Sequence, residues 1–285
     1  FWMRVYEIPE GSKTSKGRAI QNLINIEQDD KVKAFICTQD LKDEDYINSQ
    51  YVIMATKKGQ VKKTSLEQYS RPRTNGINAI TIKEDDELLE AKLTTGESQV
   101  VLALKSGKAI RFEEAKTRPM GRGASGVRGI TLAHEADEVI GMIAVDDMES
   151  NILVVSENGY GKRSSLEDYR ITNRGGKGVK TISITDKTGN LVSIKNVTDE
   201  DDLMIINKSG VAIRLAVEDL RVMGRATQGV RLINLKGNDS IAAVAKVMRE
   251  DEEEIDEDTE QTEEGSGEIN ASQTDEIATD SQEEE

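Results

Sequence analysis

The chain has 285 residues, of which 36% are hydrophobic and 32% are charged. This composition supplies a hydrophobic core, but no apolar run approaches the roughly 18 residues that a membrane-spanning helix needs, so helical membrane proteins are excluded. The formal net charge of -15 is unevenly distributed. Residues 250–285 carry 18 of the 53 acidic residues and no Lys or Arg, which leaves residues 1–249 with 35 acidic against 38 basic residues.

Residues 1–50 contain part of a pattern that recurs in full later in the chain. Gly17 opens a strand-like segment at residues 18–23, and the apolar run at residues 32–37 predicts another strand. The single cysteine, Cys37, excludes an internal disulfide and a cysteine-based zinc site, and is expected to be a small buried residue in a reducing cytoplasm. The start at Phe1 and the incomplete pattern predict further protein upstream, and no export signal is visible.

Four complete repeats of about fifty residues follow, a period typical of radial or solenoidal proteins. Each begins with an apolar strand, a tight turn that ends in glycine, and a returning strand; the first copy has these at residues 51–56, 57–59 and 60–64. The turn glycines are Gly59, Gly107, Gly159 and Gly210, and a second glycine opens a third strand at Gly76, Gly126, Gly178 and Gly229. A fourth strand closes the unit, as at residues 138–145. The only helix-like stretch is residues 65–69, so the pattern predicts an all-β protein.

Basic residues recur at fixed places in these repeats. Lys63, Arg111, Arg163 and Arg214 stand four residues after the turn glycine, and Arg118, Arg170 and Arg221 stand eleven residues after it. Arg122, Arg174 and Arg225 stand four residues before the second glycine, as Lys13 does before Gly17, while Arg73 lies three residues before Gly76. One such charge on an outward strand face commonly serves only solvation. The shared register instead predicts an outer rim of cations that contacts the phosphates of duplex DNA.

A glycine-rich loop at residues 173–180 strengthens this interpretation, because its glycines let the backbone approach a phosphate while Arg174, Lys177 and Lys180 flank it. The order of residues is not that of a P-loop, so no ATP site is expected there. No catalytic or metal-binding cluster is predicted. Tyr69 and Tyr169 occupy a repeat position that holds Thr117 and Leu220 in the other copies, which indicates packing and not a nucleophile.

The repeats resemble the C-terminal domain of the A subunit of bacterial DNA gyrase over essentially all of residues 1–249, and the acidic tail matches in character. The most specific matches are Arg-Val-Tyr-Glu-Ile-Pro at residues 4–9, Asn-Gly-Tyr-Gly-Lys-Arg at 158–163, Thr-Gln-Gly-Val at 227–230, Met-Gly-Arg at 120–122 and Gly-Val-Arg-Gly-Ile at 126–130. The resemblance implies a β-pinwheel of about six four-stranded blades, with strands exchanged between blades and the first blade truncated here. In that family, the domain wraps DNA around its basic rim.

The resemblance also implies the setting in which the domain works. It predicts a DNA-wrapping domain at residues 1–249 within a type II topoisomerase that supercoils duplex DNA negatively, near the nucleoid in the cytoplasm. The implied partners are duplex DNA, the gyrase B subunit in an A2B2 heterotetramer, and the rest of the gyrase A subunit. ATP and Mg²⁺ would act through other domains and the B subunit, so no cofactor and no catalytic tyrosine are expected in this chain.

Two features leave alternatives open. The family's Gln-Arg-Arg-Gly-Gly-Lys-Gly box is absent, and the nearest match, residues 173–178, lies in a later repeat. The A subunit of topoisomerase IV, whose similar domain lacks a proper box, is therefore a competing interpretation. A propeller-type protein scaffold is the competing interpretation from another class. The tail at residues 250–285 is predicted to be disordered, because such a charged segment buries too little apolar surface to offset its chain entropy. It would serve either as a solubilising segment or as a competitor of nucleic acid for the basic rim.

Overall fold

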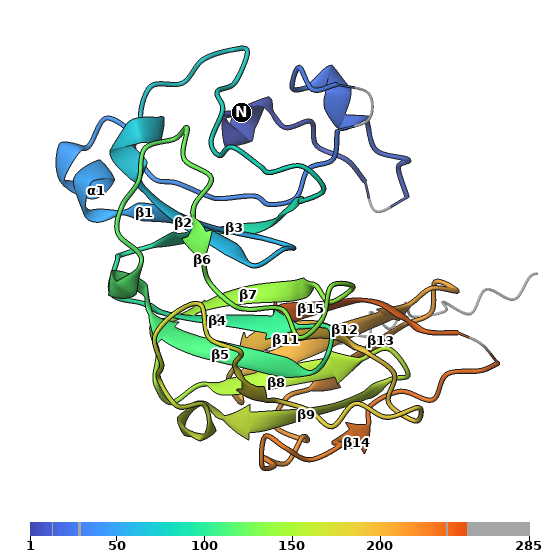
Figure 1. Cartoon of the computed structure of the whole chain (residues 1–285). Coiled ribbons are helices and arrows are strands. Elements are labelled where there is room, and N and C mark those ends of the chain that lie inside the picture. The colour runs from blue at the N-terminus through green and yellow to red at the C-terminus, as the bar shows by residue number, and fades with distance from the viewer. Residues whose placement is uncertain (13, 28–29, 238, 250–285) are drawn as a thin grey trace, which may run out of the picture. The chain divides into compact units, whose positions relative to one another are not determined.

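A computed structural model describes residues 1–12, 14–27, 30–237 and 239–249 of the chain (Figure 1). The predictions made for Lys13 and for the acidic tail at residues 250–285 lie outside the described residues. No helix in the described part is long and apolar enough to cross a membrane.

The described residues are predominantly β-structure. The strands are β1 (Tyr51–Thr56), β2 (Gln60–Ser65), β3 (Leu88–Thr94), β4 (Gln99–Leu104), β5 (Lys108–Glu113), β6 (Val127–Arg128), β7 (Val139–Val145), β8 (Asn151–Ser156), β9 (Tyr160–Ser165), β10 (Val179–Lys180), β11 (Leu191–Val197), β12 (Asp201–Asn207), β13 (Ala212–Ala216), β14 (Val230–Arg231) and β15 (Ile241–Met248). The helices are short: α1 (Glu44–Ser49) and the 3-10 helices η1 (Val5–Glu7), η2 (Ile20–Asn22), η3 (Leu66–Tyr69), η4 (Glu114–Lys116) and η5 (Leu166–Asp168).

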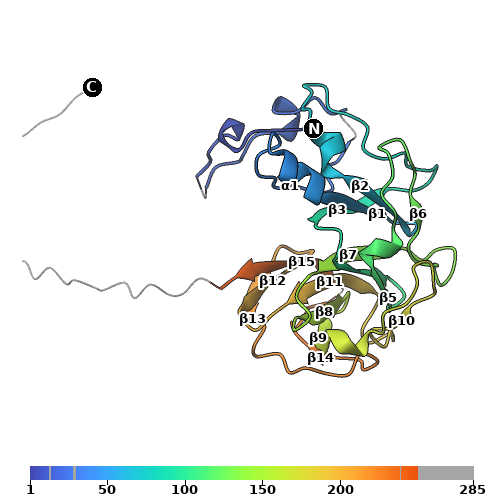
Figure 2. The same cartoon turned by 90° about the vertical axis from the view of Figure 1, so that its left-hand side faces the viewer.

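These strands form four antiparallel sheets, one for each complete repeat. The first sheet has the order β3-β1-β2-β6, the second β7-β4-β5-β10, the third β11-β8-β9-β14 and the fourth β15-β12-β13. Consecutive sheets contact each other through β3, β7, β11 and β15, which are therefore the inner strands, and Figure 2 shows the four sheets following one another around these strands. The all-β class expected from the repeats is confirmed.

The outermost strand of each four-stranded sheet comes from the next repeat along the chain. Strand β6 follows the β4-β5 hairpin but pairs with β2, where Val127 lies opposite Val61. Strands β10 and β14 pair in the same way with β5 and β9. The strand exchange implied by the resemblance is therefore present, and the fourth sheet has three strands because no further repeat follows it among residues 1–249.

Glycine is required where an exchanged strand approaches the preceding hairpin. Gly178 has φ +71°, and a Cβ built on it would lie 2.6 Å from the carbonyl oxygen of Ala109 on β5. Gly126 and Gly229 meet the preceding hairpin strand in the same way, at 2.5 Å. A side chain at these positions would meet both backbone strain and a steric clash, so the second glycine makes the exchange possible in the last three repeats.

The hydrophobic core lies between consecutive sheets. Alternate residues of β4 face opposite ways: Val100 and Leu102 pack toward the first sheet, while Val101 packs toward the third. A sheet buried on both faces explains why the first strand of each hairpin is an uninterrupted apolar run. The free face of the first sheet packs instead against residues from α1 and the segment before it, including Ile47 and Ile36.

Three expectations for the first fifty residues are wrong. Residues 32–37 form no strand, and Cys37 is exposed because Ile36 beside it faces the core of the first sheet. Residues 18–23 contain the 3-10 helix η2 and no strand. The strand expected after Gly76 is also missing. In the last three repeats, the corresponding segment pairs with the hairpin of the preceding repeat, and the described residues include no hairpin before β1.

Candidate nucleic-acid interface

Three of the four cations that stand four residues after a turn glycine do not lie on an outer rim. Lys63, Arg111 and Arg163 are only 4%, 8% and 6% exposed, respectively. The prediction of an outward position is therefore wrong for these three residues. Each lies on the second strand of its hairpin, and its side chain points into the space that the next repeat fills.

Arg111 and Arg163 hold the turn that follows the hairpin of the next repeat. Arg111 Nη1 donates to the carbonyl oxygens of Leu166 and Tyr169, at 2.6 and 3.0 Å. Arg163 donates to the carbonyl of Leu220 and pairs with Asp199. Buried carbonyls need donors, and these arginines supply them between repeats. Burial lowers the pKa of Arg111 but leaves an arginine charged near neutral pH.

Lys63 plays the corresponding part between the first and second sheets. Its Nζ lies 3.4 Å from Oε1 of Glu114, a residue of η4 with no exposed surface, and 4.5 Å from the ring centre of Tyr51. Arg214 in the fourth sheet has no such cover, so its side chain is 44% exposed and pairs with Asp202 at 2.6 Å. Lys63, Arg111 and Arg163 thus make contacts between repeats, and Arg214 is exposed because no later repeat covers it among residues 1–249.

The cations eleven residues after the turn glycine are exposed as predicted. Arg118, Arg170 and Arg221 lie in the loops that cross from one sheet to the outer edge of the preceding sheet. None of the three makes a side-chain hydrogen bond or an ion pair within the described ranges. Arg73 and Lys177 are also exposed, and no such partner is found for either among the residues described. These five cations are available to an external anion.

The arginines four residues before the second glycine are half-buried and partly fixed. Arg174 donates from Nε to the carbonyl of Lys116 at 3.0 Å and from Nη1 to that of Arg128 at 3.1 Å. Arg225 repeats this arrangement on the carbonyls of Asp168 and Lys180, at 3.0 and 2.7 Å. Each guanidinium therefore keeps a defined direction at the outer edge. Arg122 is held differently, through its main-chain N–H, which donates to Gln68 at 3.1 Å.

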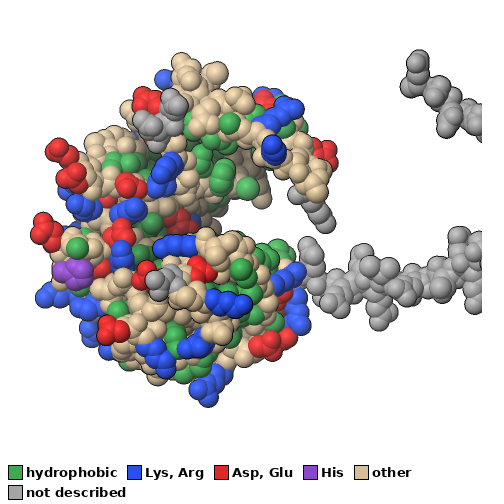
Figure 3. Space-filling model, turned by 90° about the vertical axis from the view of Figure 1, so that its right-hand side faces the viewer, with side chains coloured by type: hydrophobic (Ala, Val, Ile, Leu, Met, Phe, Trp, Pro, Cys, Tyr) green, Lys and Arg blue, Asp and Glu red, His purple; other side chains and the backbone are tan. Residues whose placement is uncertain are grey.

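A further cation register was not recognised from the sequence, which identified only Lys180 among its members, as a cation flanking the glycine-rich loop. Arg128, Lys180 and Arg231 occupy the second position of each exchanged strand and are exposed. The signal was present as a basic residue two positions after each of the last three second glycines, and only the strand exchange reveals that these residues lie on the outermost strands. Figure 3 shows Lys and Arg side chains along the lower edge of one face of the molecule.

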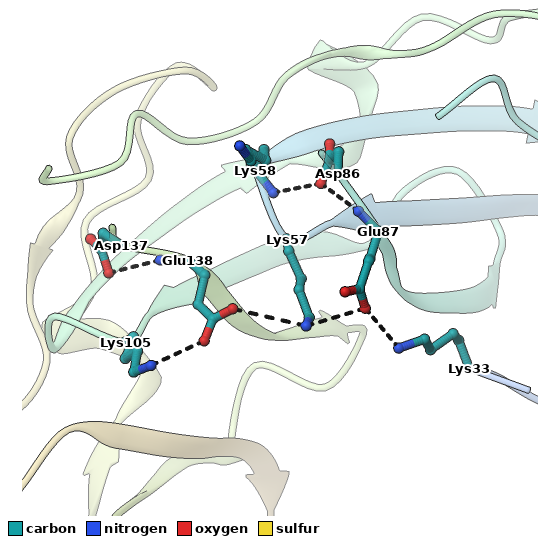
Figure 4. Close-up of polar contacts among 8 residues, drawn as sticks. All are labelled: Lys33, Lys57, Lys58, Asp86, Glu87, Lys105, Asp137 and Glu138. Atoms are coloured by element: carbon teal, nitrogen blue, oxygen red, sulfur yellow. Dashed lines mark hydrogen bonds and ion pairs between the residues drawn. The ribbon is translucent and has the colours of Figure 1, made fainter. Parts of the chain in front are cut away.

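Two lysines at the hairpin turns, Lys57 and Lys105, are paired with carboxylates. Glu87 pairs with Lys33 and Lys57 at 3.0 and 3.2 Å, and Glu138 pairs with Lys105 at 3.2 Å and with Lys57 at 4.0 Å (Figure 4). This alternating series links the turns of the first and second sheets. The two lysine pairs on Glu87 hold the pKa of its carboxyl below the ordinary value. Such cations are less available to phosphate than the unpaired ones in the crossing loops.

Two lysines lie beneath the crossing loops. Lys62 and Lys162 are 0% and 1% exposed, and burial lowers the pKa of each to about 8. Lys62 donates to the carbonyls of Ala79, at 2.6 Å, and Arg122, while Lys162 donates to the carbonyl of Gly224. Neither lysine was identified as a functional residue from the sequence, since both precede a more regular cation by one position.

No group of three or more His, Cys, Asp or Glu residues within the described ranges is arranged to hold a metal ion. Tyr169 is 1% exposed, its hydroxyl bonds that of Thr181, and burial raises its pKa to about 12, so it is a packing residue as predicted.

Comparisons with known proteins agree with this architecture. The family model of the DNA gyrase C-terminal domain, described as a β-propeller, matches residues 1–39, 50–95, 105–146, 150–198 and 201–248. The DNA gyrase A subunit of Staphylococcus aureus (strain NCTC 8325 / PS 47) is 46% identical over 261 residues, which cover 91% of this chain and 29% of that protein. The same protein of Staphylococcus aureus strain MRSA252 gives the same identity and coverage. The chain thus spans about 29% of the length of these relatives.

Two solved structures share the fold. A DNA gyrase A C-terminal domain superposes with a TM-score of 0.71 and 25% identity, covering 82% of this chain and 76% of that one. A C-terminal domain of DNA topoisomerase IV superposes with a TM-score of 0.77 and 24% identity, covering 86% of this chain and 74% of that one. The second likeness concerns the fold alone.

Proposed function

We propose that residues 1–249 of this chain, which belongs to the DNA gyrase C-terminal domain family, bind duplex DNA along the outer edges of the sheets and bend it around them. Binding depends on phosphate contacts and on the deformability of the duplex, with little reading of bases. The basic loops and exchanged strands recur once per repeat, so successive repeats present equivalent cations to successive stretches of one duplex.

The observation that carries this proposal is the repeated exposure of unpaired cations. Arg118, Arg170 and Arg221 are equivalent residues of three consecutive repeats, they are exposed, and no side-chain partner is found for them within the described ranges. Arg174 and Arg225 beside them are fixed by carbonyls of the preceding repeat. A row of cations that is not neutralised within the protein favours a polyanion with evenly spaced charges.

At the level of the whole protein, we propose that the chain is the wrapping part of a gyrase A subunit. In that setting it serves a type II topoisomerase that acts with gyrase B subunits in an A2B2 assembly near the nucleoid in the cytoplasm. ATP and Mg²⁺ act elsewhere in that assembly. The 46% identity to gyrase A subunits supports this proposal.

The proposal is tested by titrating the protein with linear duplexes of increasing length at several salt concentrations. Affinity should rise with duplex length, and its logarithm should fall steeply with the logarithm of salt concentration. The triple variant Arg118→Ala/Arg170→Ala/Arg221→Ala should make this negative slope shallower, by about 0.9 for each phosphate that it no longer binds, or roughly 2.7 in all. The matched control removes three cations that are paired with carboxylates, as Lys33→Ala/Lys57→Ala/Lys105→Ala, and should change the slope much less.

A protein-interaction scaffold is the competing function from another class. It would give an affinity for DNA that depends on neither duplex length nor salt, and that result would reject the proposal. A topoisomerase IV subunit would bind DNA with the same loops. Since the likeness to that enzyme concerns the fold alone, the gyrase assignment rests on the sequence identity.

A further inference from the structure

We infer that Lys62 and Lys162 are positioning residues for DNA binding, each of which fixes the crossing loop that carries an arginine of the interface. The inference rests on the proposed function. It assigns Lys62 to the loop of residues 120–126, which contains Arg122, and Lys162 to the loop of residues 223–229, which contains Arg225. We call these two segments the lysine-supported loops.

The contacts are similar in the two repeats but involve loop carbonyls one position apart, and Lys62 also donates to the carbonyl of Ala79. Lys62 lies on β2 and donates to the carbonyl of Arg122, while Lys162 lies on β9 and donates to the carbonyl of Gly224. Each bond fixes a peptide group that adjoins the α-carbon of the loop arginine. The direction in which Arg122 and Arg225 leave the backbone therefore depends on a buried lysine in the hairpin of the preceding repeat.

The glycines of these loops explain why such a support is needed. A Cβ added at Gly121, Gly123 or Gly224 would meet no atom within 4 Å, so these residues are not held by close packing. Glycine also has the widest conformational freedom in the unfolded chain. A bond from a charged lysine to a loop carbonyl is stronger than one between neutral groups, and it adds to the neutral bonds that hold these loops, such as the one from the Arg122 main-chain N–H to Gln68.

The corresponding loop of the second sheet is supported in another way. The residue equivalent to Lys62 and Lys162 is Ile110, which is 2% exposed. Above it lies Gly176, and a Cβ on this glycine would stand 3.4 Å from Cδ1 of Ile110. Apolar packing replaces the lysine hydrogen bond. The bonds from Thr131 to the carbonyls of Gly175 and Gly176, at 2.7 and 2.9 Å, have counterparts from Thr81 to the carbonyls of Gly123 and Ala124, so the lysine bond is the difference between the two loops. Arg174 in this loop thus provides an internal control.

The charge of each lysine adds to its structural effect. A buried ammonium costs free energy unless its donors are satisfied, and an apolar residue such as Ile110 fills the equivalent position without that cost. The lysine charge brings a second effect in return. Since Lys62 and Lys162 both lie directly beneath an arginine loop, their positive charge makes the electrostatic potential at that loop more favourable for a phosphate.

The test is a set of double-mutant cycles on DNA affinity, measured at one salt concentration with one linear duplex. Lys62→Met removes the donor with little change in length, and we expect it to weaken binding by roughly three- to tenfold in the wild-type background. In the Arg122→Ala background, the same change should weaken binding by less than about twofold, because the loop no longer carries the arginine that meets the phosphate. In the Arg174→Ala and Arg225→Ala backgrounds, the full loss should remain.

The reciprocal cycle uses Lys162→Met, which should lose its effect with Arg225→Ala and keep it with Arg122→Ala. Thermal unfolding of every variant shows which of them are folded at the assay temperature; if Lys62→Met is not, the Lys162 cycle provides the test. Lys162→Gln, which keeps side-chain N–H donors without the charge, should restore part of the affinity.

Equal losses in every background would overturn the inference, because a general loss of stability does not distinguish between loops. Failure of the proposed function would give a different result: the wild-type protein itself would bind DNA without dependence on salt or duplex length. The first outcome leaves DNA binding intact and removes only the role of the two lysines.

Discussion

Arg111 on β5 donates a hydrogen bond of 3.0 Å to the main-chain carbonyl of Tyr169, which follows the hairpin of the next repeat. The same guanidinium group donates to Leu166, so one buried cation holds both ends of η5. Arg163 makes the equivalent contact with Leu220 in the following repeat. Arg111 and Arg163, which the sequence pattern predicts to bind DNA, thus join each repeat to the next.

The first prediction concerns the stability of this junction. Arg111→Met should lower the free energy of unfolding by roughly 2–4 kcal/mol, because it removes the guanidinium that donates to the carbonyl of Tyr169 and leaves the carbonyl of Leu166 with only the main-chain N–H of Tyr169 as donor. Chemical denaturation measures this loss. The matched control, Arg170→Ala, should leave stability within about 0.5 kcal/mol of wild type and should weaken DNA binding. If Arg111→Met instead weakened DNA binding while unfolding like the wild type, the structural role of Arg111 would be wrong.

The second prediction concerns the exchange of strands. Gly178→Ala should destabilise the protein by about 2 kcal/mol or more, since the new methyl group meets a positive φ and the carbonyl of Ala109. Gly121→Ala is the control, because its Cβ would meet no atom within 4 Å. Thermal unfolding of the two variants decides the matter. Equal melting temperatures would show that the exchanged strand is not held against β5 as closely as described.

The sequence predicts the repeat, its hairpins and its glycines because each depends on local chain geometry. Gly59 and Gly178 were both identified, and both have positive φ. It does not predict burial between repeats. Arg111 and Arg170 are both basic residues at a fixed register, and only the packing of the next repeat covers the first and leaves the second exposed. Cys37 fails for the same kind of reason, since the apolar run around it has one buried side and no strand partner.

The third prediction concerns the register found on the exchanged strands. The triple variant Arg128→Ala/Lys180→Ala/Arg231→Ala should weaken duplex binding. It should also make the negative slope of log affinity against log salt shallower, by about 0.9 for each phosphate that is no longer bound. Arg231 also donates to the Tyr160 hydroxyl at 2.9 Å, so unfolding of the variant must be measured alongside. An unchanged slope in a folded variant would exclude these residues from the interface.

The fourth prediction uses the buried lysines. Lys162 has a pKa of about 8 in the folded protein, because burial disfavours its charge more than nearby Asp168 favours it, and Arg225 lowers the pKa further. In the unfolded chain its pKa returns to the ordinary value near 10.5. Between pH 8 and pH 10 the unfolded state therefore binds more protons at this site than the folded state, and the site's contribution to the free energy of unfolding rises with pH.

Replacing Lys162 by Met should remove that contribution, so wild type should gain stability relative to Lys162→Met as the pH rises from 8 to 10. Above pH 10, Tyr169, with its pKa raised to about 12, acts in the opposite direction, because its neutral form is favoured in the folded state. Denaturant unfolding of both proteins at pH 7, 8, 9 and 10 measures the effect, with the exposed Lys177→Met as the control. Parallel curves for wild type and Lys162→Met would mean that Lys162 keeps its ordinary pKa and that its ammonium is better solvated than its burial indicates.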